Sequence, residues 1–206
     1  LEGRDDLKQI VLHLGNGASA SAVKNGKPID TSMGLTPLEG LMMGTRTGDI
    51  DPAVVFHLQR VAGMSVDEVD TLFNKKSGMK GMTGESDMRS VWEVINNTSD
   101  PEASKRARTA MDVYINRLLK YVGSYAAELG GLDVITFTAG IGENDDDVRR
   151  ELAEALAPFG VKIDVEANKV RVKEPRIVSA PDSAVTLVVY PTNEELAIAR
   201  QALTFA

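Results

Sequence analysis

The beginning of the chain alternates between polar and apolar positions with the period of a β-strand. Within residues 18–23, serine or valine alternates with alanine, and side chains two residues apart lie on the same face of a strand. Asn25-Gly26 supplies the residues that a type I′ hairpin turn prefers, just before Lys27-Pro28-Ile29. We therefore predict consecutive strands joined by hairpins over residues 9–30.

A long glycine-rich stretch follows at residues 31–50. Loops of this length inside compact domains are usually functional or disordered. The segment Gly44-Thr45-Arg46-Thr47-Gly48-Asp49 contains charged and hydroxyl side chains. This content favours a functional loop.

The middle third has the apolar spacing of helices. Asp51-Pro52 supplies an N-cap and a proline at the first position of a helix that is expected to end near Val61. Ser65 and Glu68 form the capping box of a second helix. A further helix is expected at residues 87–97.

The longest predicted helix begins at Asp100-Pro101 and ends at Gly130-Gly131. Its apolar side chains recur at the spacing that places them on one face of a helix. We expect this face to lie in the core, and its residues are Ala107, Met111, Tyr114, Leu118, Tyr121, Tyr125 and Leu129.

The last third alternates between strand and helix patterns. Residues 134–138 form a short apolar strand, a glycine loop follows, and polar residues from Asn144 to Asp147 cap a helix that reaches about Ala157. Thr192 is expected to cap a terminal helix. With further short strands at 161–163, 176–179 and 185–190, this order predicts an α/β fold, in which a mixed sheet is flanked by helices and carries a helical insertion at about 52–129.

Composition places the chain among ordinary globular domains. With 206 residues, of which 43% are hydrophobic and 26% charged, it can bury the core of one domain, or of one domain with a small appendage. The net charge of −7 argues against binding to nucleic acid or to a membrane surface, which requires clustered Lys and Arg. The absence of cysteine excludes disulfides and thiol chemistry.

The sequence shows no signal peptide and no apolar run long enough for a membrane helix, so the cytoplasm is the expected location. The chain begins with Leu1-Glu2-Gly3-Arg4 rather than Met and soon enters a strand that looks buried. We interpret this start as that of a piece of a longer chain.

The turn Gly15-Asn16-Gly17 lies between two strand patterns and exposes backbone N–H groups. Glycine lets a polyanion approach the main chain closely and tolerates a positive φ, so the turn is a candidate phosphate cradle. An ordinary hairpin turn is the alternative. A second loop of similar chemistry, Thr138-Ala139-Gly140-Ile141-Gly142-Glu143-Asn144, also follows a strand and favours phosphate binding.

Two common nucleotide motifs do not apply here. Residues 15–20 fit the relaxed dinucleotide fingerprint, but that fingerprint requires a helix after the glycines, and a hairpin is predicted instead. A Walker A sequence is absent. A nucleotide site in this chain is therefore of another kind.

Four long segments resemble the acetate kinase family. They are His13-Leu14-Gly15-Asn16-Gly17-Ala18-Ser19, the stretch from Asp30 to Pro52, Phe137-Thr138-Ala139-Gly140-Ile141-Gly142-Glu143-Asn144, and Pro191-Thr192-Asn193-Glu194-Glu195. The resemblance covers only the C-terminal half of such an enzyme. It implies a ribonuclease-H-like lobe of the actin, sugar kinase and Hsp70-like superfamily, with residues 1–206 as the nucleotide-binding lobe and the N-terminal lobe absent.

The resemblance also assigns three segments to the nucleotide. Residues 13–17 resemble the family's triphosphate-binding turn, residues 87–89 its adenosine contact, and residues 140–144 the loop that closes over base and ribose. A structural histidine at position 13 and a capped helix start with a solvated arginine at 87–89 are the alternatives. The predicted nucleotide-binding residues are His13, Leu14, Gly15, Asn16, Gly17, Asp87, Met88, Arg89, Gly140, Ile141, Gly142, Glu143 and Asn144.

Arg46 is the residue that the resemblance assigns to catalysis. Phosphoryl transfer is catalysed mainly by positioning and by neutralising charge on the equatorial oxygens, and a rigid guanidinium does this better than an ammonium group. The alternative is an ion pair with Asp49 or Asp51 that anchors the loop.

Glu194 is the predicted magnesium ligand. If Thr192 caps the terminal helix, Glu195 can bond back to the cap and leaves Glu194 free. The resemblance agrees, because the family assigns the metal to the first glutamate of this motif, and a hard oxygen donor suits Mg²⁺. The alternative is that both acids complement the helix dipole. Pro37 resembles a proline at the edge of the family's acyl pocket. The alternative is that Pro37 only makes the loop backbone rigid. We assign His57 a structural role.

The resemblance implies a reversible, Mg²⁺-dependent transfer of a phosphoryl group from ATP to acetate, which gives acetyl phosphate and ADP. This half is expected to be inactive alone, because the family keeps most of the acyl pocket and a catalytic acid in the other half. Family members are typically homodimers joined through this half. The alternatives are a propionate or butyrate kinase, an acyl-independent ATPase, and a nucleotide-binding module without kinase activity, as in Hsp70-like lobes.

Overall fold

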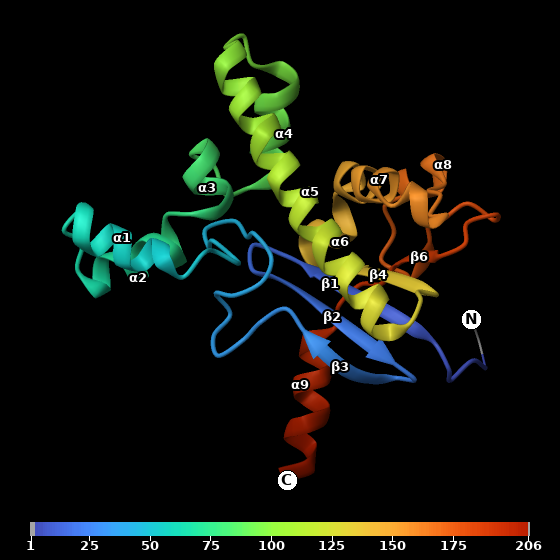
Figure 1. Ribbon diagram of the computed structural model, residues 1–206. Coiled ribbons are helices and arrows are strands. Elements are labelled where there is room, and N and C mark those ends of the chain that lie inside the picture. The colour runs from blue at the N-terminus through green and yellow to red at the C-terminus, as the bar shows by residue number, and fades with distance from the viewer. Residues whose placement is uncertain (1–2, 206) are drawn as a thin grey trace.

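The computed structural model describes residues 3–205, apart from the side chains of Glu194 and Ala197. At its centre is a six-stranded mixed sheet with the strand order β3-β2-β1-β4-β6-β5 (Figure 1). The strands are β1 (Lys8–Leu14), β2 (Ala18–Lys24), β3 (Lys27–Thr31), β4 (Val134–Thr138), β5 (Arg176–Ile177) and β6 (Thr186–Val189).

Strand directions follow from the connections. β1, β2 and β3 are joined by tight turns and pair antiparallel, whereas β1, β4 and β6 run parallel. The turn between β2 and β3 has a positive φ at Asn25 (54°) and at Gly26 (72°), as a type I′ turn requires. The predicted hairpins are confirmed, and the parallel pairing places the carboxyl ends of β1 and β4 at one edge of the sheet.

Most helices lie in the insertion between β3 and β4. In Figure 1, α1 and α2 extend to one side of the sheet, α4 and the first half of α5 extend above it, and α9 points away at the opposite end. The helices are α1 (Ala53–Val61), α2 (Val66–Lys75), α3 (Gly78–Thr83), α4 (Met88–Asn97), α5 (Pro101–Leu129), α6 (Ala139–Asn144), α7 (Asp146–Ala155), α8 (Val165–Lys169) and α9 (Glu194–Ala202), with 3-10 turns at Ala157–Phe159 and Leu203–Phe205.

The helix ends form for the reasons that the sequence suggested. Ser65 and Glu68 make the reciprocal capping box of α2, and Asp51 accepts a hydrogen bond of 2.9 Å from the Ala53 amide at the start of α1. Asp100 caps α5, and Gly130 ends it with a left-handed φ of 70°. The predicted boundaries of α2 and α5 are confirmed, whereas α1 begins one residue later than expected, with Pro52 rather than Asp51 at its N-cap.

Helix α5 provides most of the helical core. Its buried face packs with the buried side chains of β1 and β2 in one hydrophobic cluster. Tyr121 differs from the prediction, because it is only half-buried and its hydroxyl donates a 2.8 Å hydrogen bond to Asp49 Oδ2. The other predicted core residues are buried: Ala107, Met111, Tyr114, Leu118, Tyr125 and Leu129.

Several expectations were wrong in detail. Residues 139–144 form the short helix α6 rather than a loop, and residues 78–83 form a helix that the pattern did not predict. Residues 161–163 form no strand, only one bridge between Ile163 and Ser179. The terminal helix is capped by Asn193, whose side chain accepts from the Leu196 amide, rather than by Thr192. Within residues 3–205, no helix combines the length and the hydrophobicity that crossing a membrane requires.

Candidate functional site

A cleft of about 910 Å³ lies beyond the carboxyl ends of β1 and β4. Its walls come from the turn after β1, the start of α4, and the segment that runs from α6 into α7. Ligands of open α/β sheets usually bind at this edge. The cleft brings together eight of the residues predicted to bind nucleotide: Gly15, Asn16, Asp87, Met88, Arg89, Gly140, Ile141 and Asn144.

The glycine turn is a tight hairpin, and its backbone amides differ in whether they donate hydrogen bonds within the protein. The Gly15 amide donates to the Gly17 carbonyl at 3.0 Å, and the Asn16 carbonyl accepts from the Gly44 amide at 3.0 Å. Within residues 3–205, the amides of Asn16 and Gly17 donate to no protein acceptor. Neither Gly15 nor Gly17 has a positive φ, so the turn needs glycine for close approach and not for a left-handed conformation.

Neighbouring side chains lie very close to the backbone of Gly17 and of Gly44. A Cβ atom on Gly17 would lie 3.3 Å from Nη1 of Arg46. A Cβ atom on Gly44 would overlap the side-chain oxygen of Asn16. The missing side chains therefore let Arg46 lie against the turn and let Asn16 lie over the loop at 44.

Arg46 is half-buried beside the turn, and its guanidinium has no acidic partner among the described residues. Its Nη1 donates to the Pro37 carbonyl at 3.4 Å and lies 3.8 Å from the sulfur of Met43. The loop therefore presents a cation that is free to meet an anion. It also brings Arg46 and Pro37, the predicted catalytic and acyl-pocket residues, into contact.

The alternative for Arg46, a structural ion pair with Asp49 or Asp51, is wrong. Asp49 accepts from the Gly40 amide, from Tyr121 and from Arg117 instead. Asp51 caps α1. Both carboxylates are already bonded elsewhere.

The start of α4 combines a helix cap with an exposed ion pair. Asp87 accepts from the Arg89 amide at 2.9 Å and pairs with the Arg89 guanidinium at 2.6 Å. These bonds lower the pKa of Asp87 to about 2. The Arg89 side chain is 91% exposed, so the structure contains the capped start with a solvated arginine, and it places this start on the cleft wall.

Some predicted residues lie outside the cleft lining. The side chain of Leu14 is fully buried in the core and can contribute only its backbone. His13 projects from the other face of β1, where it is half-buried opposite Ser19 and Thr138. Gly142 is buried inside α6.

Glu143 links the segment after β4 to the segment that leads into α9 and does not line the cleft. Its carboxylate accepts from the Thr192 amide at 3.0 Å and from the Thr192 hydroxyl at 3.3 Å. Its carbonyl accepts from Arg176 at 3.1 Å. The segment after β4 is thereby fixed to the segment that leads into α9.

The predicted metal ligand cannot be placed by its side chain. Glu194 is the first residue of α9, and its side chain lies outside what the structure describes. Across the described part of the chain, no group of three or more His, Asp or Glu side chains is arranged to hold a metal ion.

Sequence reasoning missed much of the far cleft wall. Trp92, Glu93 and Asn96 continue the lining face of α4 from Met88 and Arg89, at helical spacing. That spacing could have identified them once the segment at 87–89 was placed at a site. The remaining lining residues are Ser86, Asp145, Asp146, Asp147 and Arg171.

Comparison with known proteins decides the family. The model of the acetokinase family matches residues 2–200. The chain belongs to the acetokinase family. It is 58% identical over 198 residues to the acetate kinase of Leifsonia xyli subsp. xyli, covering 96% of this chain and 49% of that protein, and 56% identical to that of Corynebacterium aurimucosum, covering 96% and 48%.

Solved structures of similar proteins share the fold. An acetate kinase of Porphyromonas gingivalis has a TM-score of 0.89 at 43% identity, covering 97% of this chain and 49% of that chain. An acetate kinase of Entamoeba histolytica has a TM-score of 0.90 at 36% identity (96% and 51% covered), and a propionate kinase of Francisella tularensis has 0.86 at 41% (95% and 49% covered). The predicted actin-like ATPase fold is confirmed, and the chain spans about half the length of the relatives it matches.

Proposed function

We propose that the chain is the nucleotide-binding half of a kinase that transfers a phosphoryl group from ATP to acetate, giving acetyl phosphate and ADP. The observation that carries this proposal is the position of Arg46, a half-buried cation without an acidic partner in the described residues, set against the glycine turn of an acetokinase-family chain. The reverse transfer uses the same groups.

Each segment of the site has a proposed contact with ATP. The free amides of Asn16 and Gly17 would donate to phosphate oxygens. Arg46, beside them, would neutralise the charge that develops on the phosphoryl group during transfer. The wall formed by residues 87–89 with Gly140, Ile141 and Asn144 would hold the adenosine, so that the cleft orients the nucleotide and the turn meets its phosphates.

Magnesium is the proposed cofactor. Mg²⁺ bound with a nucleotide typically takes one or two carboxylates, with phosphates and water as its other ligands. Glu194 at the start of α9 would supply the carboxylate, and the metal would neutralise phosphate charge.

Catalysis would also need the other half of the protein. We propose that residues 1–206 form one lobe with a helical insertion at about 52–129. We also propose that this lobe is inactive alone, because the relatives are about twice as long. A homodimer in the cytoplasm completes the proposal. Exposed apolar side chains at Phe56, Val61 and Val66 on α1 and α2 offer a surface for the dimer, which sedimentation of the full-length protein would measure.

Propionate or butyrate is the alternative acceptor, because a propionate kinase is among the similar structures. We expect the full-length protein to have a higher kcat/KM for acetate than for either longer acid. The measurement is ATP turnover with each acid in turn. A higher kcat/KM for propionate would reassign the substrate and leave the nucleotide site unchanged.

Gly44→Ala tests the glycine loop in the full-length protein. The new methyl group would displace the Asn16 side chain, and displacement of a positioning group by about 1 Å can lower the rate by about 10²-fold. We expect a loss of that order in kcat/KM for ATP. Gly123→Ala on α5 is the control, because a Cβ atom there meets nothing within 4 Å; equal activities of the two variants would contradict the assigned role of the turn.

A further inference from the structure

Trp92 occupies a distinctive position in the cleft. It is the only tryptophan in the chain and the only aromatic side chain among the residues that line the cleft. It lies one helical turn beyond Met88 on the lining face of α4. Its ring is half-buried, so part of it is covered by protein and part remains accessible.

Asp145 fixes the indole from the opposite wall. The indole Nε1 donates a 2.8 Å hydrogen bond to Asp145 Oδ2, and Asp145 Oδ1 accepts from the Val148 amide at 3.0 Å as the N-cap of α7. Within residues 3–205, this is the only side-chain hydrogen bond between α4 and the segment that begins α7. Oδ2 of Asp145 therefore joins the two walls, while its Oδ1 caps α7.

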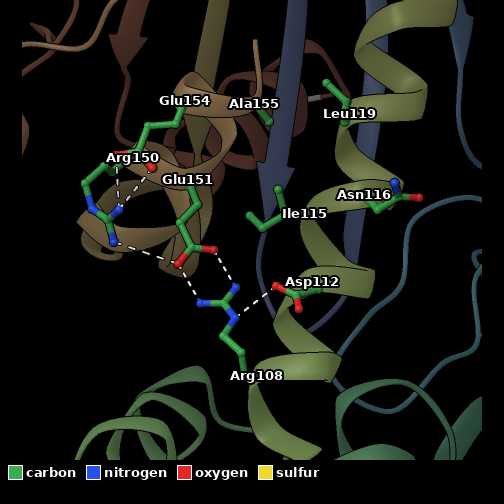
Figure 2. Close-up of a pocket in the computed structure, with 9 residues that line it drawn as sticks. All are labelled: Arg108, Asp112, Ile115, Asn116, Leu119, Arg150, Glu151, Glu154 and Ala155. Atoms are coloured by element: carbon green, nitrogen blue, oxygen red, sulfur yellow. Dashed lines mark hydrogen bonds and ion pairs between the residues drawn. The ribbon is translucent and has the colours of Figure 1, made fainter. Parts of the chain in front are cut away.

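Arg108 supports the ring from α5. Its guanidinium carbon lies 5.6 Å from the centroid of the Trp92 ring, a distance at which a cation is attracted to the aromatic face. Figure 2 shows Arg108 reaching from α5 to Glu151 of α7, and this pair has two hydrogen bonds, of 2.7 and 2.6 Å. Arg108 also donates to Asp112 at 2.9 Å. The indole is thus held by contacts from α5 and from the start of α7.

We propose that Trp92 is the stacking surface for the base of the nucleotide, held in its orientation by Asp145 and Arg108. This inference rests on the proposed function. The glycine turn, which is proposed to meet the phosphates, and the flat apolar ring of Trp92 on α4 line the same cleft, and a flat ring suits a flat base. Aromatic side chains stack on bases because every base presents a π-face.

The test compares two ligands of the full-length protein by calorimetry: ATP, which has a base, and inorganic tripolyphosphate, which has none. Trp92→Leu is expected to raise the Kd for ATP about tenfold, the loss of one stacking contact, and to leave the Kd for tripolyphosphate unchanged. Trp92→Phe keeps a ring without the Nε1 donor and is expected to raise the Kd for ATP about threefold. Phe159→Leu, which changes a ring that is 61% exposed outside the cleft, should have no effect.

A double-mutant cycle tests the support of the ring. Asp145→Asn retains a good N-cap for α7 but no longer presents an anion to the indole. If the hydrogen bond orients Trp92, the effects of Trp92→Phe and Asp145→Asn on ATP affinity will be less than additive.

The outcomes separate the two proposals. A wild-type protein that binds neither ATP nor tripolyphosphate would overturn the proposed function, and this inference with it. A wild-type protein that binds ATP, with Trp92→Leu binding it equally well, would overturn only the role of Trp92. Equal weakening of both ligands would also overturn that role, because it would indicate a general distortion of the cleft.

Discussion

Replacing Arg46 with alanine in the full-length protein is expected to lower kcat by about 10³-fold while ATP binding is largely retained. The guanidinium has no acidic partner among the described residues, so its removal breaks no ion pair of the fold. It lies against the glycine turn, where phosphate would lie during transfer. The loss should therefore appear in the chemical step.

Two controls make this result specific. Arg46→Lys keeps the charge but loses the planar fork, and should recover only part of the rate. Arg106→Ala removes an exposed arginine from α5 and should leave the rate unchanged. Full turnover by the Arg46→Ala variant would contradict the catalytic role assigned to Arg46, and the proposed mechanism would be wrong.

Replacing Arg149 with methionine is expected to lower the free energy of unfolding by about 3 kcal/mol. Arg149 is 1% exposed, and burial lowers the pKa of its guanidinium to about 10, so it remains charged at neutral pH. It donates to the side chain and to the carbonyl of Asn168 and to the carbonyl of Gly142. Methionine would leave these buried acceptors unpaired.

The matched control is the adjacent residue. Arg150 makes partly exposed ion pairs with Asp147 and Glu154 and a longer one of 3.8 Å with Glu151, and pairs near the surface typically contribute less than about 1 kcal/mol. Urea unfolding of the full-length Arg149→Met and Arg150→Met variants gives the comparison. Similar stabilities for the two would contradict a structural role of the buried arginine beneath α6.

Features that depend on neighbouring residues could be predicted from the sequence. The Asn25-Gly26 turn and the Ser65–Glu68 capping box each form within four residues of the chain, so their residue types are sufficient to specify them. The long helix was equally predictable, because its apolar spacing is sustained from Ala107 to Leu129.

The short helices could not be predicted, because distant segments hold them. The first turn of α3 donates from Met79 to the Met43 carbonyl and from Lys80 to the Gly44 carbonyl. In α6, the carbonyl of Gly142 accepts from Arg149. Glycines disfavour helix in isolation, and tertiary hydrogen bonds overcome that preference here.

The candidate site also combines features that the local sequence predicts with features that depend on distant residues. The glycine turn and Arg46 belong to ordered local motifs and were visible in the sequence. The bond between Trp92 and Asp145 joins residues 53 positions apart, and the bond between Glu143 and Thr192 joins residues 49 apart. Such pairs appear only once the fold has brought their segments together.

The most direct test of the central claim is the fate of ATP when acetate is added to the full-length protein. We expect acetyl phosphate and ADP to form in equal amounts and only when the acid is present. ADP formation at the same rate without any carboxylic acid would contradict it, because the enzyme would then be an acyl-independent ATPase.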